Sequence, residues 1–238
     1  MSATDAPKSP RASAREHTEL EILRIGRRHL TEHGAAALSL RAVARDLGVV
    51  SSAVYRYVAS RDELLTLLLV DAYNELGDAV DAAVDALPES DSRDRFQAVG
   101  RAVRAWGLAK PSRYALLFGS PVPGYAAPAE RTTVPGTRVV YRLIGILDAA
   151  HRKGELSAVA SAAVVPSLAR DMERICAELG LELPGELLAR ASSVWTGIFG
   201  AVSFEVFGQY GSGTFEALDE LFEHHLNEWA NSLGFPSK

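Results

Sequence analysis

Apolar residues recur at steps of three and four along most of this chain, and this period most constrains how the chain folds. The longest run begins at Leu64 and continues to Leu87, directly before Pro88. Other runs are separated by glycine- and proline-rich segments; the longest of these is 119–136, so the next helix is expected to begin at Thr137. The sequence has no Asn-Gly or Asp-Gly hairpin turn and no long run of period two. It therefore predicts an all-α fold.

Composition excludes several classes of protein. The 238 residues suffice for one to two domains, and 47% of them are apolar, which is enough for a sizeable core. A single cysteine, Cys176, excludes an internal disulfide framework and a multi-cysteine zinc cage. The charge-free stretches are too short to span a membrane, and the N-terminus does not resemble a secretory signal. A cytoplasmic protein without membrane association is expected, with a disordered tail over residues 1–14, which are rich in proline, alanine and serine.

The net charge of −5 is unevenly distributed along the chain. Residues 1–62 hold 10 Lys and Arg against 7 Asp and Glu, a net charge of +3. Residues 63–238 hold 15 against 23, a net charge of −8. A basic head on an acidic body places any polyanionic partner at the N-terminal end. An asymmetry of this size also arises by chance, so charge alone does not assign a function.

Two short helices joined by a glycine-centred turn are expected between Ser39 and Val58. The first would end at Gly48, the second would begin with Ser51 as its cap, and Val49 would fill the space between them. This is the pattern of a helix-turn-helix, whose second helix enters the major groove of DNA. The residues left facing outward on the second helix are Ser51, Ser52, Ala53, Tyr55, Arg56 and Tyr57.

The region around this motif resembles the tetracycline-repressor (TetR/AcrR-type) family of bacterial regulators over roughly residues 15–68. The residues that carry the resemblance are Ser39, Arg41, Ala44, Gly48, Val49, Val54, Tyr55, Tyr57 and Ser60 to Leu65. The resemblance implies a three-helix DNA-binding domain over residues 15–60 and an effector-binding and dimerisation domain over residues 61–238.

The family resemblance also implies roles for individual residues. Ser39 and Arg41 would face DNA, Ser51, Ser52 and Ala53 would lie over base edges, and Tyr55, Tyr57 and Arg61 would hold phosphates. Chemistry adds that Arg41 or Arg56 would read a guanine, because a guanidinium matches its major-groove edge. For Tyr55, a place in the core is an alternative, because it directly follows Val54, which should point inward.

The resemblance implies a homodimer that is formed by the last two helices. Residues at three- and four-residue steps there are Ile198, Val202, Phe215, Leu218, Phe222, His225 and Trp229. The period alone supports an intrachain core equally well. The segment that contains Trp195, Phe199 and Gly200 also resembles the Trp-His-Gly type of regulator C-terminus, with Phe199 where that type has histidine.

The middle helices are expected to enclose a pocket for a hydrophobic or amphipathic small-molecule effector. The large side chains proposed to line it are Trp106, Tyr114, Phe118, Tyr141, Trp195 and Phe199. For each of them an ordinary place in the core is the alternative.

Motifs for enzymatic chemistry are absent from the sequence. It has no His-Glu-x-x-His, no phosphate-binding Gly-x-x-x-x-Gly-Lys and no Gly-x-Ser-x-Gly. His224 and His225 are better explained by a solvated helix face than by a metal site, so neither a metal nor another cofactor is expected. The sequence thus predicts a homodimeric, non-enzymatic repressor that binds double-stranded operator DNA and responds to a small molecule. A ligand-independent dimeric DNA-binding protein is the alternative, and a helical hydrolase is a more distant one.

Overall fold

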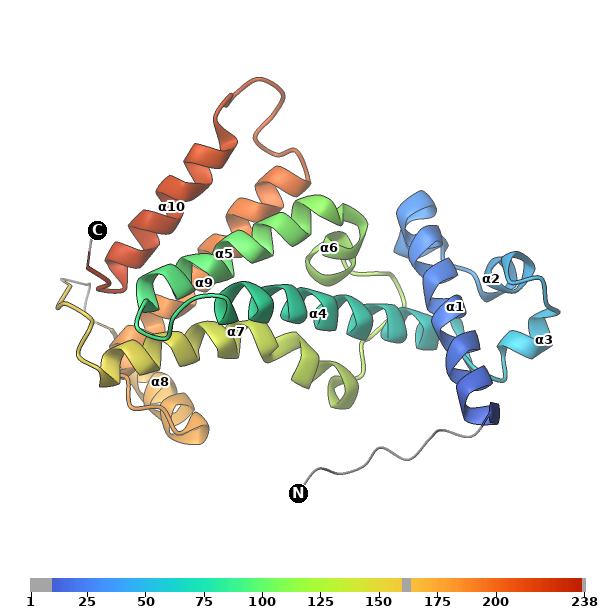
Figure 1. Cartoon of the computed structure of the whole chain (residues 1–238), viewed down its shortest axis with the longest axis horizontal. Helices are drawn as coiled ribbons and strands as arrows, with labels where there is room; N and C mark the ends of the chain where they lie inside the picture. The colour runs from blue at the N-terminus through green and yellow to red at the C-terminus, as the bar shows by residue number, and fades with distance from the viewer. Residues whose placement is uncertain (1–9, 160–163, 237–238) are drawn as a thin grey trace. The chain divides into compact units, whose positions relative to one another are not determined.

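Helices account for the regular structure of the protein, as the period of its apolar residues predicts (Figure 1). The computed structural model describes residues 10–159 and 164–236. The helices are α1 Pro10–His33, the 3-10 helix η1 Ala35–Ala37, α2 Leu40–Asp46, α3 Ser51–Val54, α4 Arg61–Asp85, α5 Ser92–Ala109, α6 Pro111–Phe118, α7 Ala129–Arg152, α8 Pro166–Leu179, α9 Gly185–Val206 and α10 Leu218–Ser232. These described ranges contain no strand, so the all-α fold is confirmed.

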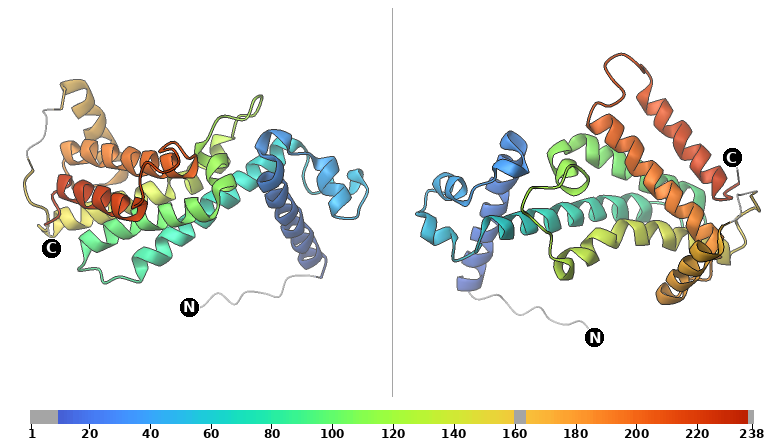
Figure 2. Two further views of the ribbon diagram at one scale, coloured as in Figure 1. Left: turned by 90° about the horizontal axis from the view of Figure 1, so that it is seen from above. Right: turned by 180° about the vertical axis from the view of Figure 1, so that it is seen from behind.

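The helices form two compact units. The first contains the residues up to 72 and residues 112–133, and the second contains residues 73–111 and 134–238. Helix α4 runs unbroken from the first unit into the second (Figure 2). The division therefore falls after Ala72, within α4, and not before Arg61 as predicted. The first turns of α4 belong to the first unit because Leu64, Leu65 and Leu68 are buried in its core.

The core of the first unit is formed by apolar residues of α1, α2, α3 and the start of α4. Its buried members are Ile22, Ile25, Leu38, Leu40, Val43, Ala44, Val54, Val58, Leu64, Leu65 and Leu68. Removing each leucine or isoleucine side chain from water contributes roughly 1.5–3 kcal/mol. Leu116, Val122 and Tyr125 pack against the same cluster, which explains why segment 112–133 belongs to this unit.

Helix α9 is central to the second unit, where it packs against α5, α8 and α10. Its buried stripe consists of Leu187, Leu188, Ala191, Val194, Ile198 and Val202. Two glycines allow helices to approach closely in this unit. A Cβ atom on Gly100 of α5 would overlap the side chain of Leu226, and one on Gly197 of α9 would lie 2.9 Å from the ring of Trp229.

One described helix, α9, is long and apolar enough to cross a membrane by length and composition alone. Core helices of globular proteins have the same properties. Helix α9 packs against three helices of its own unit, and the core accounts for its buried stripe, which is 33% of the apolar window.

Helix α1 begins earlier than the sequence predicts. It starts at Pro10, so the prediction of a disordered tail is wrong for residues 10–14, and residues 1–9 lie outside the described residues. Proline is tolerated at this position because its missing N–H is not needed in the first turn of a helix.

Helix α7 also begins earlier, at Ala129, and includes Pro135, whereas the sequence predicts a start at Thr137. The backbone N–H and the hydroxyl of Thr132 both donate to the carbonyl of Pro128, at 3.1 and 2.9 Å. The first turn is therefore stabilised by local hydrogen bonds before the proline is reached. Pro135 removes one donor in the second turn without ending the helix.

Candidate functional site

Helices α2 and α3 are joined by a tight turn. Ser39 precedes α2 in extended conformation, and Gly48 follows it with a φ of +74°, which glycine adopts without strain. The Val49 N–H donates to the Ala44 carbonyl at 3.1 Å and closes the turn. Val54 of α3 is fully buried, whereas Val49 is 40% exposed and does not fill the space between the helices. The helix-turn-helix is present, with Val54 as its internal contact.

Helix α3 spans Ser51–Val54 and is shorter than the predicted segment that ends at Val58. The chain continues as a turn in which the N–H groups of Tyr57 and Val58 both donate to the Val54 carbonyl, at 2.9 and 3.0 Å. Val50 occupies the N-cap position, so Ser51 is the first helical residue and does not cap the helix.

The outer side of α3 and of the turn after it carries the predicted DNA-contacting residues. Ser52, Tyr55 and Arg56 are exposed, while Ser51, Ala53 and Tyr57 are half-buried. Arg41 is exposed on α2, and Ser39 is half-buried at its start. Tyr55 is 49% exposed, so the alternative place in the core does not apply to it. This surface offers hydroxyl and guanidinium donors, which suit phosphate oxygens and base edges.

Arg61, predicted to hold a phosphate, is bonded to the backbone of its own unit. Its Nε donates to the Leu38 carbonyl at 3.2 Å, and its Nη2 donates to the carbonyls of Ala35 and Ala36 at 3.1 Å each. The beginning of α4 is also capped, since the Ser60 hydroxyl accepts the Glu63 N–H at 3.0 Å. Arg61 therefore fastens the start of α4 to the segment that leads into α2.

A buried histidine connects α1 with the end of α2. Nε2 of His29 lies 2.7 Å from Oδ2 of Asp46, and Arg28 donates to the same oxygen at 2.5 Å. The His29 contact, followed by that of Arg28, holds the pKa of Asp46 below its usual value. These residues were not candidates in the sequence, because nothing in its pattern indicates which charged groups of different helices meet.

Segment 112–133 is attached to the first two turns of α4. The hydroxyls of Tyr125 and Thr66 lie 2.9 Å apart. Nη1 of Arg131 donates to both carboxylate oxygens of Glu63, at 2.9 and 2.7 Å. The loop between α6 and α7 and the first turn of α7 thus form polar contacts with α4 in addition to the packing of this segment on the core.

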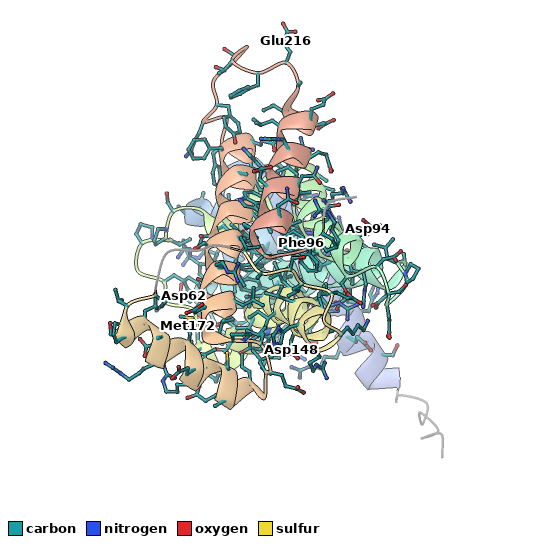
Figure 3. All side chains as sticks on the ribbon, turned by 90° about the vertical axis from the view of Figure 1, so that its left-hand side faces the viewer. Asp62, Asp94, Phe96, Asp148, Met172 and Glu216 are labelled. Carbon is teal, nitrogen blue, oxygen red and sulfur yellow. The ribbon has the colours of Figure 1, made fainter. Side chains whose placement is uncertain are left out.

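The second unit contains an apolar cavity of about 180 Å³ between α7, α8 and α9. Its lining consists of Val140, Leu143, Ile144, Met172, Ile175, Leu188, Ala191, Ser192 and Trp195. Figure 3 marks Met172, which projects from α8. The rings of Trp195 and Phe199 are in contact, with centroids 4.3 Å apart and an interplanar angle of 53°. Among the described residues no charged side chain lines this cavity.

The predicted pocket residues are distributed over both units. Trp195 lines the cavity, whereas Phe199 does not line it and contacts the ring of Trp195. Trp106 is buried, and its Nε1 donates to Glu75 at 3.2 Å, while Tyr141 is 49% exposed. Tyr114 and Phe118 belong to the first unit, where their ring centroids are 4.9 Å apart. The sequence did contain a signal for the missed lining of α8, since Met172 and Ile175 lie on one face of an amphipathic helix.

Three of the predicted dimer-interface residues require a correction. Ile198 and Val202 are 0% exposed and Phe222 is 2% exposed within a single chain, so they belong to its own core. Leu218, His225 and Trp229 are half-buried. Phe215 is exposed and precedes the start of α10, so it does not continue the helical stripe.

Aromatic side chains are exposed near the end of α9 and in the loop after it, among them the predicted dimer-interface residue Phe215. Phe204 is 46% and Phe207 41% exposed. The ring of Tyr210 lies 5.2 Å from that of Phe204 and 5.3 Å from that of Phe215. We call Phe204, Phe207, Tyr210 and Phe215 the aromatic tip.

A helix-turn-helix joined through a long helix to a larger helical unit defines the class of helix-turn-helix DNA-binding proteins. A family model described as "Bacterial regulatory proteins, tetR family" matches residues 22–68. A second model, described as "Tetracyclin repressor-like, C-terminal domain", matches residues 96–228. The chain belongs to the tetR family of bacterial regulatory proteins.

Individual relatives agree with this assignment. The chain is 50% identical over 202 residues to the HTH-type transcriptional regulator Rv1816 of Mycobacterium tuberculosis, covering 85% of this chain and 86% of that protein. The crystal structure of SCO4313 has 29% identity and a TM-score of 0.74, covering 94% of this chain and all of that one. A Rhodococcus sp. RHA1 protein of unknown function has the same fold, with 21% identity, a TM-score of 0.67 and coverage of 91% and 95%.

The protein is therefore a DNA-binding transcriptional regulator and not an enzyme. The likeness of its C-terminal part to the Trp-His-Gly type stays a prediction.

Proposed function

We propose that the protein is a homodimeric repressor that leaves its operator when a small, uncharged effector binds in the cavity of the second unit. The observation that carries the proposal is the apolar cavity itself. The cavity opens to the surface beside the exposed Ser192, so a molecule can enter it, and its deeper wall is formed by the buried apolar residues Leu143, Ile144, Leu188 and Ala191. An apolar lining with few polar groups is typical of small-molecule sites.

The lining of the cavity favours an apolar or amphipathic molecule. A charge placed against Leu143, Ile144 and Met172 would lose its hydration without gaining a partner. Trp195 offers an aromatic face, and the hydroxyl of Ser192, an exposed residue, can bond a polar end of the molecule. The volume is below the roughly 300–1,000 Å³ of sites for drug-sized ligands. The effector is therefore small, or it inserts only an apolar part.

The effector signal has a route along α7 and α4 within the second unit. Arg138 of α7 pairs with Asp78 and Asp81 of α4, each at 2.7 Å, and Arg142 pairs with Asp85. Helix α7 lines the cavity, and α4 continues into the first unit. A shift of α7 on effector binding would move α4, provided that the effector binds the two states with different affinity.

DNA would be bound by the outer side of α2 and α3. Arg41 or Arg56 would read a guanine, and Ser51, Ser52 and Ala53 would lie over base edges, where their short side chains make few bidentate contacts. Ser39, Tyr55 and Tyr57 would contact the backbone, with Arg61 holding the entry to α2 in place.

The aromatic tip supports a dimer surface on the outer side of α9 and the loop after it. Exposed aromatic side chains gathered in one place mark interaction surfaces. A two-fold dimer uses the same patch on both subunits, and it would present two DNA-binding heads to a palindromic operator. Leu218, His225 and Trp229, which are half-buried, can extend this surface along α10.

The proposal is tested with a duplex that the protein itself selects from a random library. Binding is measured by fluorescence anisotropy in the presence of uncharged alcohols, esters and alkylbenzenes and of their carboxylate counterparts. The proposal expects an uncharged molecule to stabilise the protein against heat and to release the duplex. Release by anions alone would contradict the effector class. Absence of stabilisation and release with every molecule would favour the ligand-independent alternative.

A further inference from the structure

The first unit contains a cavity of its own, with a volume of about 420 Å³. One wall is the end of α1 with η1, represented by Leu30 and Ala36. The other wall is α6 with the loop after it, represented by Ala115, Leu116 and Val122. This volume lies within the roughly 300–1,000 Å³ range of small-molecule sites, unlike that of the cavity of the second unit.

The α1–η1 wall is fixed by Arg61. The carbonyls of Ala35 and Ala36, two residues of this wall, accept hydrogen bonds from Nη2 of Arg61 at 3.1 Å each. Arg61 begins α4, and its Nε also holds the carbonyl of Leu38, the residue before Ser39. The wall is thus bonded to the segments on both sides of the helix-turn-helix.

The opposite wall is fixed to the same helix. Val122 packs on the core of the unit, and Tyr125, three residues later, is hydrogen-bonded to Thr66 of α4 at 2.9 Å. Arg131 forms its ion pair with Glu63, also on α4. Both walls are therefore attached to the first two turns of α4, and the space between them is preformed. Preformed sites bind with less loss of conformational freedom.

The lining defines the chemistry of an occupant. The cavity is open to solvent on one side, and its described lining contains no charged side chain. An ionised group would therefore give up part of its hydration without gaining an opposite charge. Hydroxyls of Thr31, Ser112 and Ser120 lie among its apolar residues. The Thr31 hydroxyl already donates to the Arg27 carbonyl at 3.1 Å, which leaves its oxygen free to accept a hydrogen bond from a ligand.

We propose that this cavity is a second ligand site, separate from the proposed effector cavity, that takes an uncharged apolar molecule with a hydrogen-bond donor and thereby changes affinity for DNA. Arg61 connects this cavity to the helix-turn-helix, because it is bonded to the carbonyls of Ala35 and Ala36 and to that of Leu38. A ligand that contacts Ala35 and Ala36 acts on the carbonyls that hold Arg61, and Ser39, two residues after η1, leads into α2. The proposal goes beyond the proposed function, since the effector cavity can be correct while this site is empty.

The probe is N-phenyl-1-naphthylamine, an uncharged apolar molecule with one N–H donor whose fluorescence rises in apolar surroundings. Hydrogen exchange of the full-length protein, followed by mass spectrometry, is compared with and without the probe. The proposal expects slower exchange in peptides that cover residues 30–36 and 112–123. Protection confined to residues 140–144, 172–175 and 188–195, or no protection, would overturn it.

Variants separate this site from a general effect on folding. Ala36→Phe adds a ring to the cavity wall, and Ala115→Phe does so from the opposite wall. Ala37→Phe is the matched control, because Ala37 is exposed on the same short helix and does not line the cavity. In the Ser192→Phe background, which obstructs the second unit's cavity, each filling variant should weaken probe binding about tenfold or more, and the control should not. Equal probe binding by the two filling variants and the control would contradict the proposal that the probe occupies this cavity.

The effect of this site on DNA binding is tested by a separate measurement of affinity for the duplex. In the Ser192→Phe background, a saturating probe concentration should change the affinity for the selected duplex on the order of fivefold or more. The Ala36→Phe substitution should abolish this change. An unchanged affinity while hydrogen exchange shows the site occupied would overturn the coupling to DNA.

Discussion

Nε2 of His29 lies 2.7 Å from Oδ2 of Asp46 and joins α1 to the end of α2. His29 is buried, and the guanidinium of Arg28 binds the same carboxylate from the neighbouring position on α1. The first helix of the helix-turn-helix is therefore held by polar contacts in addition to apolar packing. Loss of the charge on Asp46 would therefore weaken the attachment of α2 to α1.

The first unit should lose stability in acid. Because the pKa of Asp46 is lowered in the folded protein, its contacts contribute stability that is fully present above the ordinary pKa of 3.8 and is lost as the pH falls through the folded value. Asp46→Asn should lower the thermal midpoint at neutral pH and reduce the decline in acid. Circular dichroism melts between about pH 7 and pH 2 measure both. Glu19→Gln on α1 is the control, because the partner of Glu19 is Arg15. Identical pH profiles for Asp46→Asn and the wild type would contradict this account.

Two glycines should respond to the same substitution in opposite directions. Gly48 has a φ of +74°, so Gly48→Ala should destabilise the helix-turn-helix by about 1–2 kcal/mol. Gly145 is exposed within α7, and a Cβ there meets nothing within 4 Å, so Gly145→Ala should stabilise the protein by about 0.5–1 kcal/mol. Urea unfolding measures both, and a gain in stability from Gly48→Ala would show that the turn does not require glycine.

The sequence predicts the all-α fold and the helix-turn-helix because both depend on local patterns. The step of three and four residues marks each helix, and Gly48 marks the turn. The sequence does not predict the early start of α7, because a proline such as Pro135 usually marks the end of a helix. In the structure, hydrogen bonds to the Pro128 carbonyl stabilise the first turn of α7 before Pro135 is reached.

Contacts between helices could not be predicted in the same way. The period of α9 places Ile198 on a buried stripe, and it does not show whether another helix of the chain or a second subunit covers that stripe. The cavity lining was missed for a related reason. Large aromatic residues were favoured, whereas aliphatic residues such as Leu143 and Met172 form most of the lining, and Trp106 bonds to Glu75.

Substitutions in the helix-turn-helix should distinguish residues that recognise the base sequence from residues that contribute affinity for any DNA. Arg41→Ala should relax the preference at one base pair, with a loss of about 1–3 kcal/mol on the preferred sequence. Tyr57→Phe removes the hydroxyl that is proposed to donate to a phosphate, and it should weaken binding to all sequences alike. Selection from a random duplex library, followed by anisotropy on matched and mismatched duplexes, measures both effects. Unchanged affinity in both variants would contradict the assigned surface.

A charge on the aromatic tip should dissociate the proposed dimer. Phe204→Glu would bury a carboxylate against the partner, and it should favour the monomer and weaken operator binding. Leu108→Glu is the control, because Leu108 on α5 is an apolar residue of comparable exposure. Sedimentation velocity gives the oligomeric state, and circular dichroism verifies folding. A Phe204→Glu protein that sediments as the wild type does would exclude this surface.

The central claim is that a ligand in the cavity of the second unit controls the binding of DNA. Ser192 lines the cavity and Ser193, its exposed neighbour on α9, does not, so Ser192→Phe and Ser193→Phe form a matched pair. The most direct test is the affinity of both variants for the selected duplex, with and without the molecule that stabilises the wild type. The account predicts that this molecule releases the duplex from the wild type and Ser193→Phe and leaves it bound to Ser192→Phe. Equal release from all three proteins would contradict it.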